Sequence, residues 1–214
     1  GDLAAAEPLC REALEVQRET LGNRHPSTLT SISNLAALLH AKGDCAAAEP
    51  LYREAVEGMR ETLGDRHQHT LSSISNLGTM LKVKGDYAAA ESLCREALEV
   101  QRETLGNRHP STLTSINNLG VLLQAKGDYA TAELLCREAL EVQRETLGSR
   151  HTDTLASMNN LGTLLHVKGD LAGAEPLYRE ALKGQRETLD SRHPHTLRSI
   201  NNLGKLLKEK GDQP

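Results

Sequence analysis

The sequence lacks two of the three large aromatic residues. It contains no Phe and no Trp, and its four Tyr amount to an aromatic fraction of 2%. A core without large rings has to be packed from aliphatic side chains, here mainly Leu and Ala. A surface without such rings offers no platform on which nucleic-acid bases could stack.

An excess of one charge sign is also missing. The 25 basic and 29 acidic residues give a net charge of −4 at pH 7. Non-specific binding to nucleic acids or to anionic membranes requires a strong positive field. We therefore expect neither nucleic acid nor membrane among the partners.

Long apolar runs are absent too. No stretch approaches the roughly 18 consecutive apolar residues of a membrane-spanning helix, and no basic and apolar leader precedes the first repeat. The four cysteines fit the cytoplasmic location that this predicts. Cys10, Cys94 and Cys136 occupy one repeat position and are separated by units of about 10 Å, which exceeds disulfide reach. We expect reduced core residues there, and only Cys45, at a helix start, is a candidate for reactivity.

The chain is instead rich in internal repetition. Gly-Asp pairs recur every 42 residues, and the segment from Arg11 to Ile32 is repeated without change from Arg95 to Ile116. Such a period indicates a tandem array. We expect a single domain over residues 1–214, with half-units at both ends. Its five units begin at Gly1, Gly43, Gly85, Gly127 and Gly169.

Each unit reads as a helical hairpin. In the third full unit, Thr112–Lys126 has apolar residues at helical spacing and predicts a first helix, here termed helix A. Pro110 suits its start, Gly127 can adopt the left-handed conformation that ends it, and Asp128 can cap the next helix. That second helix, helix B, is expected over about Tyr129–Leu147. The array therefore predicts ten helices, beginning with a helix B and ending with a helix A.

Small residues recur inside both helices. A Gly within a helix costs about 1 kcal/mol relative to Ala, so its recurrence in helix A needs a packing reason. Close approach of helix A to helix B supplies that reason. The helix A glycines are Gly78, Gly120, Gly162 and Gly204.

These repeats resemble a known family. The motifs Asn118-Leu119-Gly120, Gly127-Asp128-Tyr129 and Ala139-Leu140 are similar to the tetratricopeptide repeat (TPR), and the 42-residue period with Arg108-His109-Pro110 is similar to its kinesin light chain version. The resemblance implies an all-α, right-handed superhelical solenoid of antiparallel helical hairpins. It also implies that the A helices line a concave groove, and that the protein is a non-catalytic protein-protein interaction scaffold. Leu or Cys stands where large aromatics are frequent in the family, so an aromatic ligand pocket is not expected.

The nine histidines are candidates for catalytic or metal-binding residues. Five of them share one loop position, which favours a structural role such as satisfying carbonyl groups at the end of helix B. Two His-x-His pairs, at His67 and at His193, lack the third and fourth ligands of a metal site. The sequence has no phosphate-binding glycine loop and no nucleophile elbow. We therefore expect no enzyme activity, metal or cofactor.

The charges divide between the two helices. Helix A residues (28–42, 70–84, 112–126, 154–168 and 196–210) hold nine Lys or Arg and one acid, Glu209, so they carry +8 and the remainder carries −12. Five of these cations end a helix A and offset its dipole. The others share a polar stripe with amide side chains, which predicts a peptide-binding groove. Its candidate residues are Asn76, Asn117, Asn118, Asn159, Asn160, Asn201, Asn202, Lys82, Gln124, His166, Arg198, Lys205 and Lys208.

The resemblance implies that this groove takes an extended peptide, and the basic residues at the last unit of the stripe favour an acidic one. In the family that the repeats resemble, an Asn of helix A often bonds the peptide backbone; the competing interpretation is a bond between neighbouring helices. The alternative function is a purely structural or designed array, or a regulatory fragment of a larger protein, with head-to-tail self-association. The two half-units motivate that alternative, because Ala6, Leu9, Cys10 and Ala13 lack a covering helix A, and Leu203, Leu206 and Leu207 lack a helix B.

Overall fold

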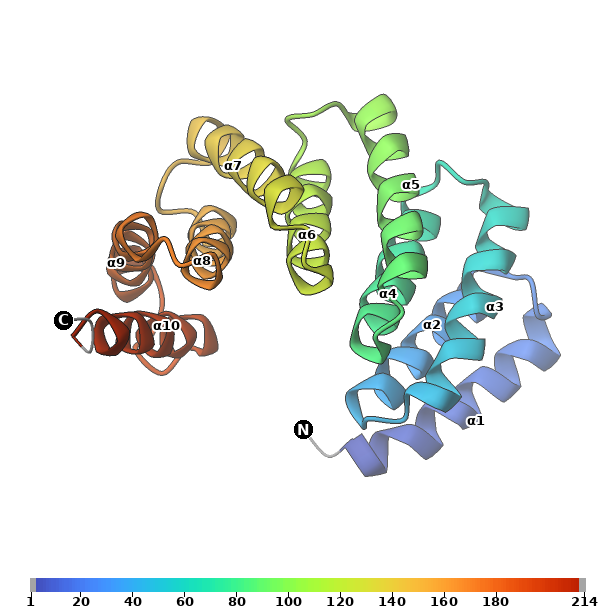
Figure 1. The fold of residues 1–214 in the computed structure, drawn as a ribbon. Coiled ribbons are helices and arrows are strands. Elements are labelled where there is room, and N and C mark those ends of the chain that lie inside the picture. The colour runs from blue at the N-terminus through green and yellow to red at the C-terminus, as the bar shows by residue number, and fades with distance from the viewer. Residues whose placement is uncertain (1–2, 212–214) are drawn as a thin grey trace. The chain divides into compact units, whose positions relative to one another are not determined.

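The computed structural model describes residues 3–211, which form ten α-helices and no strand (Figure 1). Its residues group into two compact units, Gly1–Thr104 and Leu105–Pro214. The all-α architecture predicted from the repeats is confirmed. The helices are α1 (Leu3–Leu21), α2 (Pro26–Ala41), α3 (Cys45–Leu63), α4 (Gln68–Lys84), α5 (Tyr87–Leu105), α6 (Pro110–Lys126), α7 (Tyr129–Thr146), α8 (Thr152–Val167), α9 (Leu171–Thr188) and α10 (Pro194–Gly211).

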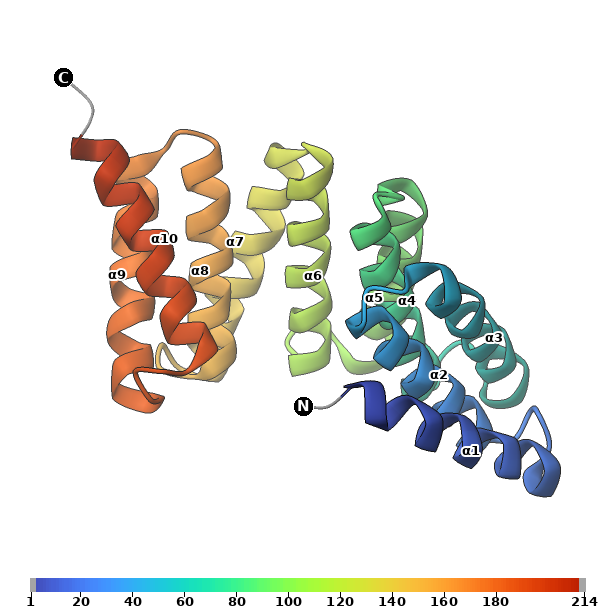
Figure 2. The same ribbon diagram turned by 90° about the horizontal axis from the view of Figure 1, so that it is seen from below.

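The even-numbered helices correspond to helix A and the odd-numbered ones to helix B. Within the second unit, α6 and α7 form one hairpin and α8 and α9 form the next, and α10 packs against α8 and α9 (Figure 2). Within the first unit, α2 and α3 form a hairpin that lies between α1 and α4. Within these units, α2 therefore contacts both α1 and α3, and α8 contacts both α7 and α9, so a helix A lies against the helix B before it and the helix B after it.

The residues that end and start the helices act as predicted. Gly127 ends α6 with φ 96°, a left-handed conformation that glycine adopts without steric cost. Asp128 then caps α7, because its Oδ1 accepts the backbone N–H of Thr131 at 3.2 Å. Pro110 is the first residue of α6, as its suitability for a helix start predicts. The helix therefore begins two residues before the segment Thr112–Lys126 that the apolar spacing indicated.

The repeated histidine caps helix A. His109 Nδ1 accepts the backbone N–H of Ser111 at 3.1 Å, at the start of α6. The prediction of a structural role is thus confirmed, but the expected partner was wrong, because the ring satisfies an amide of helix A and not a carbonyl of helix B. A ring nitrogen that accepts this bond is unprotonated. The same bond is made by His25, His67, His151 and His193.

The glycines of helix A mark close contacts with helix B. A Cβ placed on Gly120 would lie 2.7 Å from the Sγ of Cys136, and one on Gly162 would lie 2.8 Å from Cε1 of Tyr178. Both distances are far below van der Waals contact, so these positions exclude larger residues. The predicted packing reason is confirmed. Gly204 differs, because a Cβ there would meet nothing within 4 Å.

Acidic residues of helix B link this helix to the helix A that follows it. Glu49 of α3 pairs with Arg53 one turn later at 2.8 Å and with Lys84 at the end of α4 at 2.6 Å. Hydrogen bonds from Lys84 and then Arg53 lower the pKa of the Glu49 carboxyl. Lys84 therefore bridges to the preceding helix B in addition to offsetting its own helix dipole. The equivalent clusters are centred on Glu7, Glu133 and Glu175.

The cysteines are free thiols. Cys136 is buried beneath Gly120, and burial raises the pKa of its thiol to about 11. Burial also raises the pKa of Cys94. A thiol that stays protonated at neutral pH is a poor nucleophile, so these two residues serve packing, as predicted.

A candidate peptide groove on the A helices of the second unit

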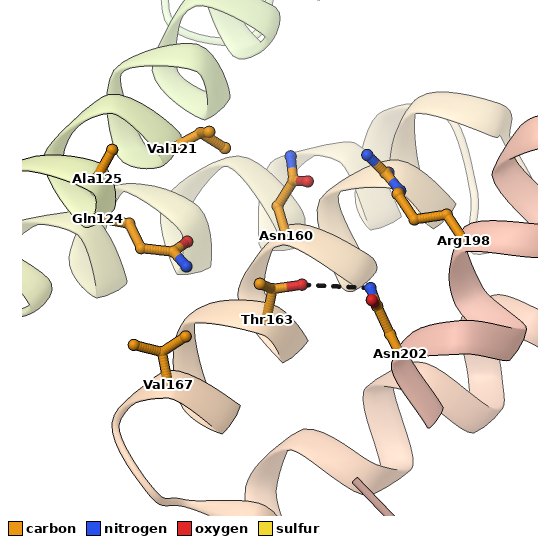
Figure 3. Close-up of a pocket in the computed structure, with 8 residues that line it drawn as sticks. All are labelled: Val121, Gln124, Ala125, Asn160, Thr163, Val167, Arg198 and Asn202. Carbon is orange, nitrogen blue, oxygen red and sulfur yellow. Dashed lines mark hydrogen bonds between the residues drawn. The ribbon is translucent and has the colours of Figure 1, made fainter. Parts of the chain in front are cut away.

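A groove of about 380 Å³ runs across three A helices of the second unit, α6, α8 and α10 (Figure 3). These helices lie side by side because α6 packs on α8, and α8 packs on α10. The floor combines short aliphatic side chains with amide and hydroxyl groups. The lining residues are Val121, Gln124, Ala125, Asn160, Thr163, Val167, Arg198 and Asn202.

Thr163 organises the polar side of this groove. Its Oγ1 donates to the backbone carbonyl of Asn159 at 2.8 Å and accepts from the Tyr178 hydroxyl at 3.1 Å and from Asn202 Nδ2 at 3.4 Å. Tyr178 reaches Thr163 from α9 because Gly162 leaves room for its ring. Burial raises the pKa of the Tyr178 phenol, which therefore remains a neutral donor. These bonds fix the side chain of Asn202 at the wall of the groove.

Two other lining residues are free to bind a ligand. In Figure 3, Asn160 of α8 and Arg198 of α10 project into the space between the helices. Among residues 3–211, neither side chain has a hydrogen-bond or ion-pair partner, and Asn160 is half-buried while Arg198 is exposed. An amide offers a donor and an acceptor together, and a guanidinium can bind a carboxylate with two parallel hydrogen bonds.

Four predicted site residues thus line one groove: Gln124, Asn160, Arg198 and Asn202. Asn118 of α6 and Asn201, Lys205 and Lys208 of α10 are exposed outside its lining. His166 of α8 contacts Glu209 of α10, with Nε2 and Oε2 2.8 Å apart. Two further predicted residues, Asn76 and Lys82, lie on α4 in the first unit.

Asn117 and Asn159 do not belong to the groove, and their predicted position there was wrong. Both are buried between helices. Asn117 Nδ2 donates to Ser157 Oγ at 2.5 Å, and Ser157 donates to Gln143 at 2.5 Å. At the equivalent position, the Oδ1 of Asn159 accepts a hydrogen bond from the Ser199 hydroxyl at 2.9 Å. These asparagines join consecutive A helices, because their position faces the next helix A.

Sequence reasoning also missed part of the groove. The contributions of Ala125, Val167 and the Tyr178 hydroxyl were not predicted, although Tyr178 stands where Cys94 and Cys136 stand in neighbouring units. The replacement of Cys by Tyr at this repeat position was the signal in the sequence that could have indicated this contribution. It marks a helix pair in which a helix B hydroxyl bonds a lining residue of the groove, Thr163.

The described residues contain neither a cluster of metal ligands nor a membrane-spanning helix. Within 3–211, no three His, Cys, Asp or Glu residues are grouped as ligands for a metal ion. None of the helices in this part of the chain is both long and apolar enough to cross a membrane. The groove has amide, hydroxyl and guanidinium groups, so its chemistry is that of hydrogen bonding and charge recognition.

Comparison with known proteins agrees with this architecture. A family model described as the tetratricopeptide repeat matches residues 1–61, 30–81, 69–145, 115–184 and 158–214. The crystal structure of BtubC (BKLC) from P. vanneervenii superposes with a TM-score of 0.81 at 25% identity, covering 99% of this chain and 85% of that one.

A second similar structure is that of the nearly identical TPR-like repeats of a putative kinesin light chain from Podosopora anserina. Its TM-score is 0.73 at 30% identity, covering 88% of this chain and 90% of that chain. A variant of the same protein gives 0.75 at 29% identity, with coverage of 88% and 89%. A search of curated proteins finds no match.

Proposed function

Because the chain belongs to the tetratricopeptide repeat family, we propose that it is a non-catalytic protein-interaction scaffold whose A-helix groove binds an extended acidic peptide. The observation that carries this proposal is the groove across α6, α8 and α10, with its unpartnered Asn160 and Arg198. We also propose a cytoplasmic location, which the free thiols of the chain suit.

Charge around α10 supports an acidic ligand. Lys210 is paired with Glu175, and the acid Glu209 is paired with His166. Among the described residues, Arg198, Lys205 and Lys208 have no carboxylate partner and are exposed. These three cations remain available on one helix, at one end of the groove, so they would orient a peptide whose acidic residues lie toward that end.

The remainder of the groove suits a peptide backbone. Asn160 can donate to a carbonyl and accept from an amide of an extended chain. Val121, Ala125 and Val167 supply an apolar floor for alternate side chains of that chain. Each partly exposed ion pair adds only about 0.2 to 1 kcal/mol, so the amide and the floor would hold the ligand while charge sets orientation and association rate.

Selection from a peptide library tests the proposal. The 214-residue chain should select extended sequences rich in Asp and Glu, and Asn160→Ala should weaken the selected peptide by about tenfold, the loss of one hydrogen bond of about 1.4 kcal/mol. Arg198→Glu should weaken it by a similar factor. Lys183→Glu is the matched control, because Lys183 is exposed on α9 and lies outside the groove. A selection without consensus would contradict the proposal and would favour a purely structural array.

A further inference from the structure

The two ends of the repeat array match each other in shape. Inside the second unit, α9 packs beside α7 and α8, and the three helices together line a groove of about 520 Å³. On the receiving side lie Leu140, Arg144 and Leu161, and on the docking side lie Pro176 and Leu177 of α9. This junction shows how the array receives a helix B.

The same receiving surface recurs one period later, on α9 and α10, where no helix of residues 3–211 forms the opposite wall. Leu182, Arg186 and Leu203 line a groove of about 340 Å³, and they stand 42 residues after Leu140, Arg144 and Leu161. Leu197 of α10 is 47% exposed, whereas its counterpart Leu155 of α8 is 1% exposed. Ile200 and Leu207 are likewise exposed, in contrast to Met158 and Leu165. The expectation that Leu203 and Leu206 are uncovered was wrong, because α8 and α9 bury them.

The complementary surface lies on α1. Leu9 is 66% exposed, and Ala13 is exposed although its counterparts in the other B helices are all buried. Val16 is also exposed, one period before Gly58. No helix of the described chain covers this face of α1. Gly58 and Gly184 share the repeat position of Val16 and face Leu29 and Leu155 of the preceding helix A. The same position holds Val100 and Val142 in the other units, so the repeat also accepts a valine there. In the same register, Val16 would face Leu197.

Charged residues at the two ends are complementary as well. Between B helices, Arg18 pairs with Glu54 at 2.8 Å and Arg144 pairs with Glu180 at 2.6 Å. Arg186 is the last arginine of this series, and Glu12 is the glutamate one period before Glu54. Among residues 3–211, neither Arg186 nor Glu12 has an ion-pair partner.

A second series repeats this relation. Arg24 pairs with Glu61 at 3.2 Å, and Arg150 pairs with Glu187 at 3.0 Å. Its last arginine is Arg192, and the glutamate one period before Glu61 is Glu19; both lack an ion-pair partner in the described chain. Two free arginines at one end thus match two free glutamates at the other.

We propose that α1 of one molecule docks on α9 and α10 of a second copy of this chain, in the register of the internal repeats. Glu12 would pair with Arg186 and Glu19 with Arg192 of the neighbouring copy. Leu9 would enter the groove at Leu203, and Cys10 would cover Gly204, as Tyr178 covers Gly162. The surface is independent of the peptide groove, because Arg198 and Asn202 project from a different side of α10 than Leu197 and Leu207.

This contact is heterologous, because it joins two different surfaces. Each associated molecule still presents one free end, so growth continues beyond a dimer. The occupant is a second copy of the 214-residue chain, because both ion-pair series and the contact of Cys10 with Gly204 match in one register. Another protein would have to reproduce all of these features.

Sedimentation of the 214-residue chain from micromolar to millimolar concentration tests the proposal. The mean mass should rise continuously with concentration. Ala13→Asp, at an exposed position in the monomer, should weaken association by at least about tenfold, since it would place a charge against buried apolar surface. Circular dichroism should show that the variant folds.

Charge reversal provides the sharper test. Glu12→Arg and Arg186→Glu should each weaken self-association severalfold, because each places like charges together. An equimolar mixture of the two variants should recover association, since every contact between unlike molecules restores an opposite pair. Glu15→Arg is the matched control, because Glu15 is exposed on α1 and belongs to neither series. A strict monomer, a dimer that does not grow, or association indifferent to these variants would overturn the proposal.

Discussion

Gly162 and Gly204 form a matched pair that tests how helix A packs on helix B. Both occupy the same repeat position in neighbouring A helices. A Cβ on Gly162 would lie 2.8 Å from Cε1 and 3.0 Å from Cδ1 of Tyr178, whereas a Cβ on Gly204 would meet nothing within 4 Å. The same substitution should therefore have opposite effects at the two positions.

Gly162→Val should lower the free energy of unfolding by about 2 to 3 kcal/mol. Overpacking a core costs about 1 to 3 kcal/mol, and the upper half applies because Tyr178 is a rigid ring with 1% exposure. A single methyl is better tolerated, since the α2–α3 hairpin already combines Ala36 with Tyr52, both buried. Gly204→Val should be neutral or stabilising by about 0.3 kcal/mol, because Val is a slightly better helix former than Gly.

Urea unfolding followed by circular dichroism measures both variants against the parent chain. It should be done at low micromolar concentration, where end-to-end association is minimal. Equal destabilisation by the two substitutions would refute the packing account, since it would mean that the cost comes from the helix backbone and not from Tyr178. A stabilising effect of Gly162→Val would refute it as well.

Three further predictions concern stability and its dependence on pH. Leu119→Ala should cost about 2 to 5 kcal/mol in urea unfolding, because Leu119 is 1% exposed and its truncation leaves a cavity in the core; a loss below about 1 kcal/mol would contradict this. The Lys168 and Arg137 hydrogen bonds lower the pKa of Glu133 in the folded state, so the stability that they provide is present above the unfolded value of 4.5 and is lost as pH falls through the lowered value. Glu133→Gln should therefore flatten the fall in stability between neutral and acid pH, and an unchanged pH profile would refute this assignment. Hydrogen exchange at low concentration should be fastest in α1, which packs mainly against α2, and in α10, whose Leu197, Ile200 and Leu207 are exposed; uniform protection along the chain would contradict that expectation.

Residues whose role is set by local chain geometry could be predicted from the sequence. The 42-residue period, the turn at Gly127, the cap at Asp128 and the helix start at Pro110 each depend only on neighbouring residues. The small residue at Gly120 was also interpretable, because a glycine inside a helix needs a close neighbour. These features were enough to establish the hairpins and their order.

Roles that depend on how helices face each other could not be predicted. Asn117 and Asn118 are adjacent and similar in sequence, yet about 100° of helix rotation separates them, so one is buried against the next helix A and the other is exposed. The pairs Arg18–Glu54 and Arg24–Glu61 join residues 36 and 37 positions apart. Only the stacking of units brings such residues together. The cap made by His109 is local, because its ring accepts the N–H of Ser111 two residues along the chain. It was assigned to the wrong partner because the path of the loop decides which backbone group the ring meets.

The central claim is that the groove on α6, α8 and α10 binds an acidic peptide. The most direct measurement is a titration of the library-selected peptide against the parent chain and against the double variant Lys205→Glu with Lys208→Glu. The account predicts binding about tenfold weaker in the variant, equivalent to about 1.4 kcal/mol, with unchanged folding. It also predicts a comparable weakening of the parent at 1 M salt, where screening acts beyond about 3 Å. A basic selected peptide, or affinity indifferent to both salt and the substitutions, would contradict the account.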